Sequence, residues 1–374
     1  VFKDFNDFKN LDYISIWFYK AANYLRNFHS KCAFVTTNSV SQGEQVGLLW
    51  PKILIDGVEI GFAHNDFKWT NNAKGGAGVT VIILCLRNVS KSSKIIFYEN
   101  YNKKVDKINA YLLDYKDIYF SRRSSPLSDF SPMKRGSMPT DGGNFSLNEN
   151  QKNQIIDEGS EFSKYIKRYL SGDDFLNKKI RYCIWVDDID FNHANKNSII
   201  KNRFNAIKEF RLKSKAPSTI EYSKYPNRFR QIAYEDSDFI ILPLTSSEKR
   251  KYIPMDFYSK GAVVTNAAGV IYNAKLIDFS ILTSNIHNIW IKTICGCLES
   301  RIRYSSAIGL NNFPFPKISN QRKEELNQCA LKIVDERLKH SEKTLAQLYD
   351  PDKMPEGLKE AHHQNDLAVE RCYK

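Results

Sequence analysis

The chain has 374 residues, of which 42% are hydrophobic and 13% aromatic, so it is neither disordered nor collagen-like. At this length we expect two or three domains. Lys and Arg outnumber Asp and Glu by 55 to 42, and the resulting net charge of +13 favours a polyanionic partner, with nucleic acid first and a membrane surface second.

No segment has the length or composition that spans or targets a membrane. The longest apolar run, residues 79–86, is far shorter than the ~18–20 residues that cross a bilayer, and no signal-peptide pattern opens the chain. The seven cysteines are an odd number within mostly apolar stretches, which is typical of a reducing compartment. We therefore expect a cytoplasmic protein. Because the first residue is Val1, we also expect the sequence to be a piece of a longer chain.

Residues 1–120 follow an α/β pattern. Apolar spacing predicts helices over 11–25 and 43–50 and strands over 31–37, 59–69 and 78–86. The order helix, strand, helix, strand, strand corresponds to the closing half of a Rossmann-like, doubly wound sheet whose opening half is missing from this sequence. A loop rich in Asn and Gly, residues 70–76, is expected between the last two strands.

Residues 121–315 have an α+β pattern, and residues 316–374 are helical. The stretch 122–150 is loop-like because Pro and Gly interrupt it repeatedly. After it we predict strands over 181–186, 229–233 and 238–244, a basic helix over 199–213 and a core helix over 276–298. The C-terminal helices are expected to break at Pro351 and Pro355.

The positive charge is concentrated in the middle segment, which holds 29 basic and 20 acidic residues. Within it, residues 196–230 carry ten basic side chains against Glu209 and Glu221 alone. This density favours a groove for a polyanion, in which Lys208, Lys213 and Lys215 neutralise phosphates. The alternative is a solvated lysine-rich helix face, which is the ordinary role of a run of like charges.

Several short patterns point to ordinary structure rather than to chemistry. Gly75–Gly78 precedes a predicted strand, so a hairpin turn is favoured over a phosphate-binding loop. The pair Cys295 and Cys297 has no second pair or suitably spaced His and is assigned to the core, and no metal site is expected. Asp66-Phe67-Lys68 has a form found in nucleases, but a nuclease needs a further acidic ligand upstream, and a pattern of three residues recurs by chance.

Phe67 and Trp69 lie at the end of a predicted strand, beside the Asn- and Gly-rich loop. Aromatic side chains at such a position pack in a core or form an exposed face on which an extruded base stacks. The sequence pattern alone leaves both alternatives open.

Longer stretches of the sequence resemble the MmeI-like family of fused restriction-modification enzymes, in the family's order and over nearly the whole chain. They are CAFVTTNSVSQGEQ from Cys32, FKWTN from Phe67, SSEKRKYIP from Ser246, NNFPFP from Asn311 and TLAQLYDPDKMP from Thr344. The resemblance implies an adenine-N6 DNA methyltransferase that uses S-adenosylmethionine and binds double-stranded DNA. It implies a division into the end of the methyltransferase domain, 1–120, a target-recognition domain, 121–315, and a C-terminal helical segment, 316–374.

The sequence also departs from the family pattern. The family's glycine motif for S-adenosylmethionine, its Asn-Pro-Pro-aromatic catalytic motif and its N-terminal nuclease have no counterpart here, and no Pro-Pro pair occurs. We therefore expect this chain alone to lack cofactor binding and methyl transfer, and we assign it no catalytic or cofactor-binding residue.

By resemblance, Phe67 is the first candidate for stacking on a flipped base and Trp69 the second. The candidates for DNA contact in the middle segment are basic or hydroxyl side chains, since these donate to phosphates and to guanine edges. They are Lys134, Arg135, Lys208, Lys213, Lys215, Ser246, Ser247, Lys249, Arg250 and Lys251. A non-catalytic specificity subunit that binds nucleic acid is the alternative function, and for Ser246 and Ser247 the alternative is a polar turn. Neutral C-terminal helices argue against membrane-surface binding.

Overall fold

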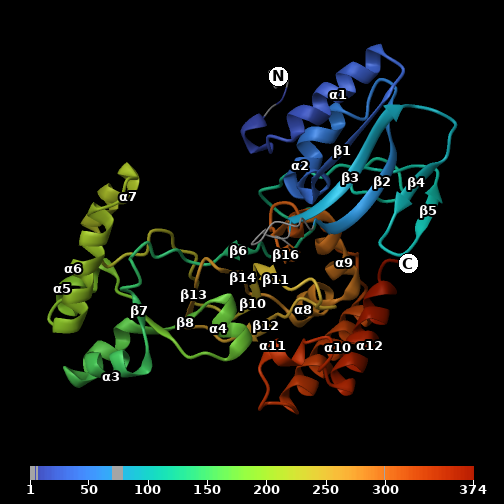
Figure 1. Cartoon of the computed structure of the whole chain (residues 1–374). Coiled ribbons are helices and arrows are strands. Elements are labelled where there is room, and N and C mark those ends of the chain that lie inside the picture. Colours follow the sequence, from blue (N-terminus) through green and yellow to red (C-terminus); the bar gives the residue numbers. More distant parts are fainter. Residues whose placement is uncertain (1–4, 6, 70–78, 299) are drawn as a thin grey trace. The chain divides into compact units, whose positions relative to one another are not determined.

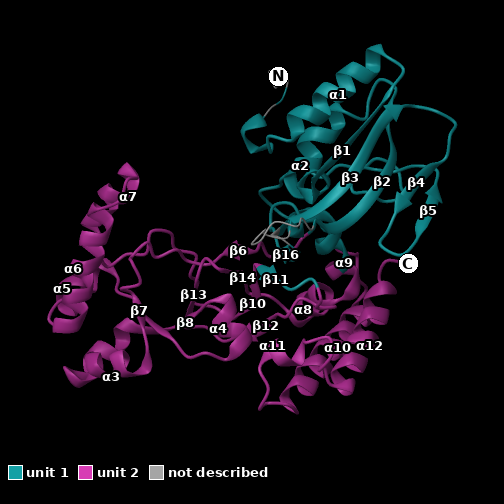
Figure 2. Ribbon diagram, in the orientation of Figure 1, with its two compact units in different colours: residues 1–128, 245–248, 289–314 teal, residues 129–244, 249–288, 315–374 magenta. Residues whose placement is uncertain are grey.

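The computed structural model describes residues 5, 7–69, 79–298 and 300–374. The chain divides into two compact units, which Figure 2 distinguishes by colour. Unit 1 comprises residues 1–128, 245–248 and 289–314, and unit 2 comprises residues 129–244, 249–288 and 315–374.

Unit 1 is built on a five-stranded sheet of order β1-β3-β2-β4-β5 (Figure 1). Its strands are β1 (Lys31–Thr37), β2 (Val58–Trp69), β3 (Val79–Asn88), β4 (Lys94–Phe97) and β5 (Asn102–Val105). Strand β3 is antiparallel to both β1 and β2, so these two outer neighbours run parallel to each other. Strand β4 continues the sheet parallel to β2, and β5 pairs with β4 in the antiparallel sense.

The core of unit 1 lies between this sheet and the helices α1 (Ser15–Asn27) and α2 (Gly43–Leu49). Helix α1 buries Phe18, Ala21, Ala22 and Leu25, which recur at helical spacing. After α2 the fully buried Trp50 donates its indole N–H to the carbonyl of Val40 at 2.6 Å. Unit 1 also contains a small sheet and short 3-10 helices: β11 (Thr245–Ser246), β15 (Cys297–Leu298), β16 (Arg301–Arg303), η1 (Phe8–Asn10), η2 (Asn38–Ser41), η3 (Trp50–Lys52) and η7 (Leu310–Asn312).

Unit 2 holds two four-stranded sheets, of order β12-β10-β14-β6 and β13-β8-β9-β7. The strands are β6 (Lys134–Arg135), β7 (Ser146–Leu147), β8 (Ile166–Leu170), β9 (Tyr182–Ile184), β10 (Phe239–Pro243), β12 (Asp256–Tyr258), β13 (Ala262–Val264) and β14 (Ala268–Tyr272). The first sheet is antiparallel throughout, and the second includes the parallel pair β8 and β13. Strands β10 and β14 are buried along their whole length, so both faces of the sheet are covered at these two central strands.

Helices surround these sheets. They are α3 (Glu149–Asp157), α4 (Gly172–Asn177), α5 (Phe191–Ala194), α6 (Ser198–Leu212) and α7 (Pro217–Glu221), with the 3-10 helices η4 (Ser160–Tyr165), η5 (Asp188–Asp190) and η6 (Tyr222–Lys224). The side chain of Asn197 begins α6 by accepting from the N–H of Ile200 at 3.0 Å, and it donates to the carbonyl of Ile155 in α3 at 3.0 Å. One buried side chain therefore caps α6 and joins it to α3.

The chain ends in helices α8 (Leu276–Thr283), α10 (Asn320–Leu338), α11 (Leu345–Leu348) and α12 (Glu356–Glu370), and α9 (Asn285–Ile294) follows α8 directly. The side chain of Thr344 accepts from the N–H of Gln347 at 3.3 Å, and the Gln347 side chain accepts from the N–H of Thr344 at 2.8 Å, which fixes the start of α11. Helices α10 and α12 lie side by side and contact α8 (Figure 1).

The mixed α/β fold predicted from the sequence is confirmed, and most predicted elements are present. Two predictions are wrong. Residues 229–233 form no strand, because Phe229 points into the core and only Gln231 pairs, through a single bridge to Met138. Residues 276–298 form α8, α9 and a short strand instead of one helix, because Ser284 between the helices is extended at φ −69°, ψ 156°. The sequence patterns did not predict strands β4 to β8 or β11 to β16. The predicted loop 70–76 and the Gly75–Gly78 turn lie outside the described residues.

Candidate nucleic-acid interface

The ends of β1 and β2 meet at one edge of the sheet in unit 1. Thr37 and Phe67 both pair with Val81, one on each side of β3, so they lie in the same row of the sheet. Asn38, directly after β1, donates its amide to the carboxylate of Asp66 at 3.0 Å and joins the two strand ends. Ligands of open α/β sheets bind beyond the carboxyl ends of parallel strands, which makes this edge a candidate site.

The two aromatic candidates differ in their surroundings. Phe67 is half-buried, and its ring meets the ring of His64 edge-on at 4.8 Å between centroids. Trp69 is 48% exposed. The pairing of β2 with β3 shifts between His64 and Phe67, and such a bulge redirects the side chains that follow it. Both aromatic side chains thus belong to this edge of the sheet, and Trp69 is the more accessible of the two.

Lys134 and Arg135 form strand β6 at the edge of a sheet in unit 2, and both are exposed. Lys134 pairs with the carboxylate of Glu235, and its side chain is 46% exposed. Arg135 donates its Nε–H to the carbonyl of Asn266 at 2.6 Å. Arg135 is therefore fixed by a backbone oxygen, whereas Lys134 must leave a carboxylate to meet a phosphate.

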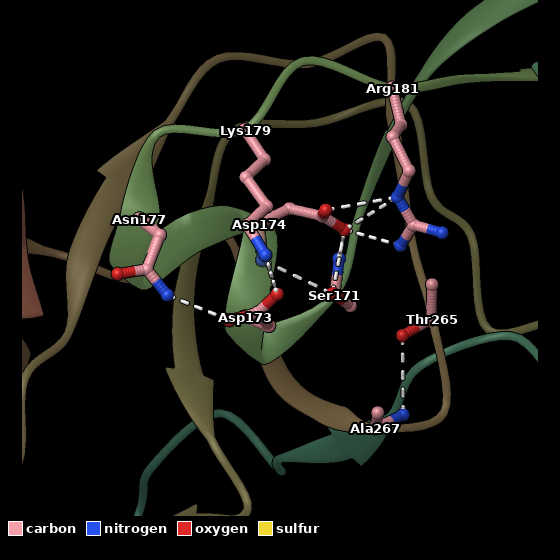
Figure 3. A network of polar contacts seen from close by, with 8 residues as sticks. All are labelled: Ser171, Asp173, Asp174, Asn177, Lys179, Arg181, Thr265 and Ala267. Carbon is pink, nitrogen blue, oxygen red and sulfur yellow. Dashed lines mark hydrogen bonds and ion pairs between the residues drawn. The ribbon is translucent and has the colours of Figure 1, made fainter. Parts of the chain in front are cut away.

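The turn that carries Asn266 is supported by the polar network of Figure 3. The buried carboxylate of Asp174 accepts from Nε of Arg181 at 2.9 Å and from the N–H of Ser171 at 2.8 Å, which fixes the start of α4. Gly172 in that first turn lies against the carbonyl of Ala267, whose own N–H donates to Oγ1 of Thr265 at 3.3 Å. The network therefore holds the α4 terminus beside the turn that orients Arg135.

The lysines of α6 and its C-terminal extension are exposed, as a phosphate contact requires. Lys208, Lys213 and Lys215 are all exposed, and none of them pairs with an acidic side chain of the described residues. The opposite face of α6 buries Ile200, Phe204, Ile207 and Arg211. These three lysines therefore have charges that are free to neutralise phosphates without exchanging a protein partner.

Three arginines of the basic run have structural roles instead. Arg211 is fully buried and donates to the carbonyls of Pro139, Thr140, Tyr222, Tyr225 and Arg228 at 2.7–3.4 Å. Arg203 donates to the carbonyls of Asn144 and Ser146, and Arg228 pairs with Asp188. Burial lowers the pKa of both Arg203 and Arg211. The number of basic residues in the run therefore overestimates the positive charge that is available to DNA, because these half-buried and buried guanidinium groups bind other parts of the protein.

The segment from Ser246 to Lys251 is only partly accessible. Ser246 lies in β11 and is 3% exposed, so its hydroxyl does not reach the surface, and we leave it out of the contacts proposed below. Ser247 and Arg250 are half-buried, whereas Lys249 and Lys251 are exposed. Lys251 lies 3.9 Å from the carboxylate of Asp366 in α12. The acidic partners of the basic candidates lie far from them in the sequence: Asp366 is the partner of Lys251, and Glu235 is the partner of Lys134. No local sequence pattern indicates these partners.

The described residues contain neither a metal-binding cluster nor a glycine-rich cofactor loop. They contain no group of three or more His, Cys, Asp or Glu side chains arranged to hold a metal ion. Among the described residues, no turn from a strand into a helix contains more than one glycine, so they do not fit S-adenosylmethionine in the manner of a glycine-rich loop. No described helix is long and apolar enough to cross a membrane.

Comparisons with known proteins identify the family. Three family models match in order: the MmeI DNA-methyltransferase domain over residues 1–98, the MmeI target recognition domain over 114–317 and the MmeI C-terminal domain over 318–374. DNA methyltransferase A of Bacillus subtilis (strain 168) is 38% identical over 367 residues, which are 98% of this chain and 42% of that protein.

A solved structure agrees with these matches. The Type IIL restriction-modification enzyme MmeI, in complex with DNA, matches all of this chain with a TM-score of 0.93 and 36% sequence identity. The match covers 51% of that chain, so the present chain spans about half the length of the relatives it resembles. A fold that is shared over the whole chain, with the same three domains in the same order, shows that the chain belongs to the MmeI family.

Proposed function

We propose that this chain is the DNA-recognition part of a site-specific adenine-N6 DNA methyltransferase of a restriction-modification system. The match of the whole chain to MmeI, whose structure contains DNA, is the observation that carries the proposal. The similarity to a DNA methyltransferase at 38% identity supports the same activity. S-adenosylmethionine is the proposed methyl donor of the whole protein.

Within unit 1, Phe67 and Trp69 are proposed to stack on an adenine that leaves the duplex. Extrusion costs a few kcal/mol of base stacking, and an aromatic ring at the sheet edge offsets part of it. The half-buried Phe67 is held by His64 and suits a fixed platform. The exposed Trp69 suits a second wall. This assignment keeps Phe67 as the first candidate.

Basic side chains of unit 2 and one hydroxyl side chain of unit 1 are proposed to meet the duplex. The proposed contacts are Lys134, Arg135, Lys208, Lys213, Lys215, Lys249, Arg250 and Lys251 in unit 2 and Ser247 in unit 1. Those without a carboxylate partner among the described residues contribute most to the electrostatic part of binding, because each neutralised phosphate releases counterions. Arg135, fixed by the carbonyl of Asn266, is suited to a base edge, which requires a defined geometry.

The proposal also covers the organisation of the protein. Residues 1–120 are proposed to close the methyltransferase domain, 121–315 to form the target-recognition domain and 316–374 to support it, in a cytoplasmic bacterial protein. An N-terminal nuclease in the whole protein belongs to the same proposal, since the family fuses both activities.

Sequencing of modified bases tests the proposed activity. The full-length gene is expressed in a bacterial strain without its own adenine methylation, and the genomic DNA is sequenced by a method that detects N6-methyladenine. We expect one short sequence to be methylated throughout the genome. Methylation of cytosine would overturn the adenine assignment, and absence of methylation together with sequence-specific DNA binding would identify a non-catalytic specificity subunit instead.

A further inference from the structure

The exposed lysines of the basic turn, which we define as residues 249–251, are followed at once by a buried segment. Tyr252, Ile253 and Met255 are each 2% exposed or less, whereas Lys249 and Lys251 face solvent. The backbone N–H of Ile253 donates to the side chain of Asn288 at 2.7 Å. The direction in which the lysines point is therefore set by what holds the residues directly after them.

Asp366 in α12 is the first residue that holds this buried segment in place. Its carboxylate, 6% exposed, accepts a hydrogen bond from the hydroxyl of Tyr252 at 2.7 Å and another from the N–H of Asn285 at 2.7 Å. The ammonium of Lys251 is 3.9 Å away and its side chain is 60% exposed. The short bonds go to Tyr252 and Asn285, so Asp366 holds the segment in place and leaves the charge of Lys251 accessible.

A second set of contacts joins the same segment to the other C-terminal helices. The ring of His362 stacks on the ring of Tyr252 with centroids 4.1 Å apart, and its Nε2 lies 2.7 Å from the hydroxyl of Tyr349. Arg337 in α10 donates to that hydroxyl at 2.9 Å and to the carbonyl of Met255 at 2.9 Å. Helix α12 thus contacts the start of residues 252–255 through Tyr252, and helix α10 contacts the end through Met255.

We propose that Asp366 is a positioning residue for DNA recognition: through Tyr252 it fixes the backbone from which Lys249 and Lys251 meet DNA phosphates. This rests on the proposed function. It assigns a role to the C-terminal helices, which hold the basic turn in its binding geometry. A cation contributes to binding in full only when its backbone is already ordered, because ordering it on binding costs conformational entropy.

The test measures the affinity of the full-length protein for a short duplex DNA over a range of salt concentrations. In the otherwise unchanged protein, Lys249→Gln with Lys251→Gln is expected to reduce the log–log salt slope by about 1.8, at ~0.9 for each lost phosphate contact. Asp366→Ala is expected to reduce the slope by a similar amount. In the Asp366→Ala background, the two lysine changes are expected to add little.

Asp366→Asn is the conservative variant. Its amide keeps the shape and can still accept from Asn285 while donating to the oxygen of Tyr252, so it is expected to keep the original slope. Ser280→Ala is the matched control, because the hydroxyl of Ser280 is equally buried and bonds to the neighbouring Asn365 at 2.5 Å without touching the basic turn. It is expected to lower thermal stability and leave the slope unchanged. If Asp366→Ala does not fold, Tyr252→Phe, which removes only the hydroxyl, takes its place.

The outcomes separate this inference from the proposed function. The positioning role is supported if Asp366→Ala reduces the salt slope while Asp366→Asn and Ser280→Ala do not. It also requires that the lysine changes add little to the effect of Asp366→Ala. An unchanged slope in Asp366→Ala, or tighter binding because Lys251 is released, overturns the role and leaves the lysine contacts intact. If the two lysine changes have no effect in the otherwise unchanged protein, the turn itself does not contact DNA.

Discussion

Neutralisation of the α6 lysines gives the most quantitative test of how DNA meets unit 2. Successive residues of a helix are about 100° apart, so Lys201 and Lys208, seven residues apart, lie within about 20° of each other. Lys213, the residue directly after α6, lies about 140° from Lys208 around the same axis, across the exposed side of the helix. The exposed lysines therefore form two groups on that side, one with Lys201 and Lys208 and the other with Lys213 and Lys215.

A duplex that lies over the exposed side of α6 reaches both groups. We therefore expect Lys201→Gln with Lys208→Gln, and Lys213→Gln with Lys215→Gln, each to reduce the log–log salt slope by about 1.8. Over a fourfold rise in salt, each double variant loses about tenfold less affinity than the unaltered protein. Fluorescence anisotropy with a labelled duplex measures both quantities.

The two pairs remove the same number of charges from the same exposed part of the chain, so their effects can be compared directly. A reduction by one pair alone would contradict the assignment of phosphate contacts to both groups. No reduction by either pair would show that the run is a solvated face, which is the alternative that the sequence left open.

Three further predictions concern single residues. Phe67→Ala in the full-length enzyme is expected to lower methylation roughly fivefold to 150-fold, for a lost stacking contact of ~1–3 kcal/mol, with the recognised sequence unchanged in methylome sequencing; full activity would move the role to Trp69. Arg211→Met is expected to destabilise the protein by more than about 3 kcal/mol in urea denaturation, because five carbonyls lose their donor, and a change below ~1 kcal/mol would contradict this. Burial lowers the pKa of His287 to about 3, so this histidine stays neutral in the folded protein while it gains a proton in the unfolded chain below about pH 6.5. The contribution of neutral His287 to the free energy of unfolding is therefore fully present above pH 6.5. It decreases as the pH falls, by about 2 kcal/mol at pH 5, and His287→Gln is expected to remove that part of the loss of stability.

Much of the fold could be predicted from local patterns, and the errors have physical causes. Strand β1 matches the predicted residues because the run is short and rich in aromatic and β-branched residues, which favour a strand over a helix. Strands β4 and β5 have four residues each, too few for a period to show. The sequence pattern does not reveal the break at Ser284, because apolar residues continue on both sides of it. Ser is nevertheless a favoured residue at the start of a helix.

The candidate site was less predictable, since accessibility depends on contacts between distant residues. Exposed Lys208 and buried Arg211 look alike in a count of charges, and only the fold distinguishes them. Ser246 resembles a phosphate ligand in the sequence but is covered in β11. The anchors of the basic turn, Asp366 and His362, lie more than a hundred residues away in the chain. The family resemblance supplied the role of Phe67, which the local pattern could not decide.

We propose that the middle segment of this chain chooses the DNA sequence that the full-length protein methylates. Exchange of residues 114–317 for the matching segment of a relative with a different recognition sequence tests this role directly, with N6-methyladenine sequencing as the measurement. We expect the methylated sequence to follow the exchanged segment. Methylation that stays at the original sequence after the exchange would show that the segment does not choose it.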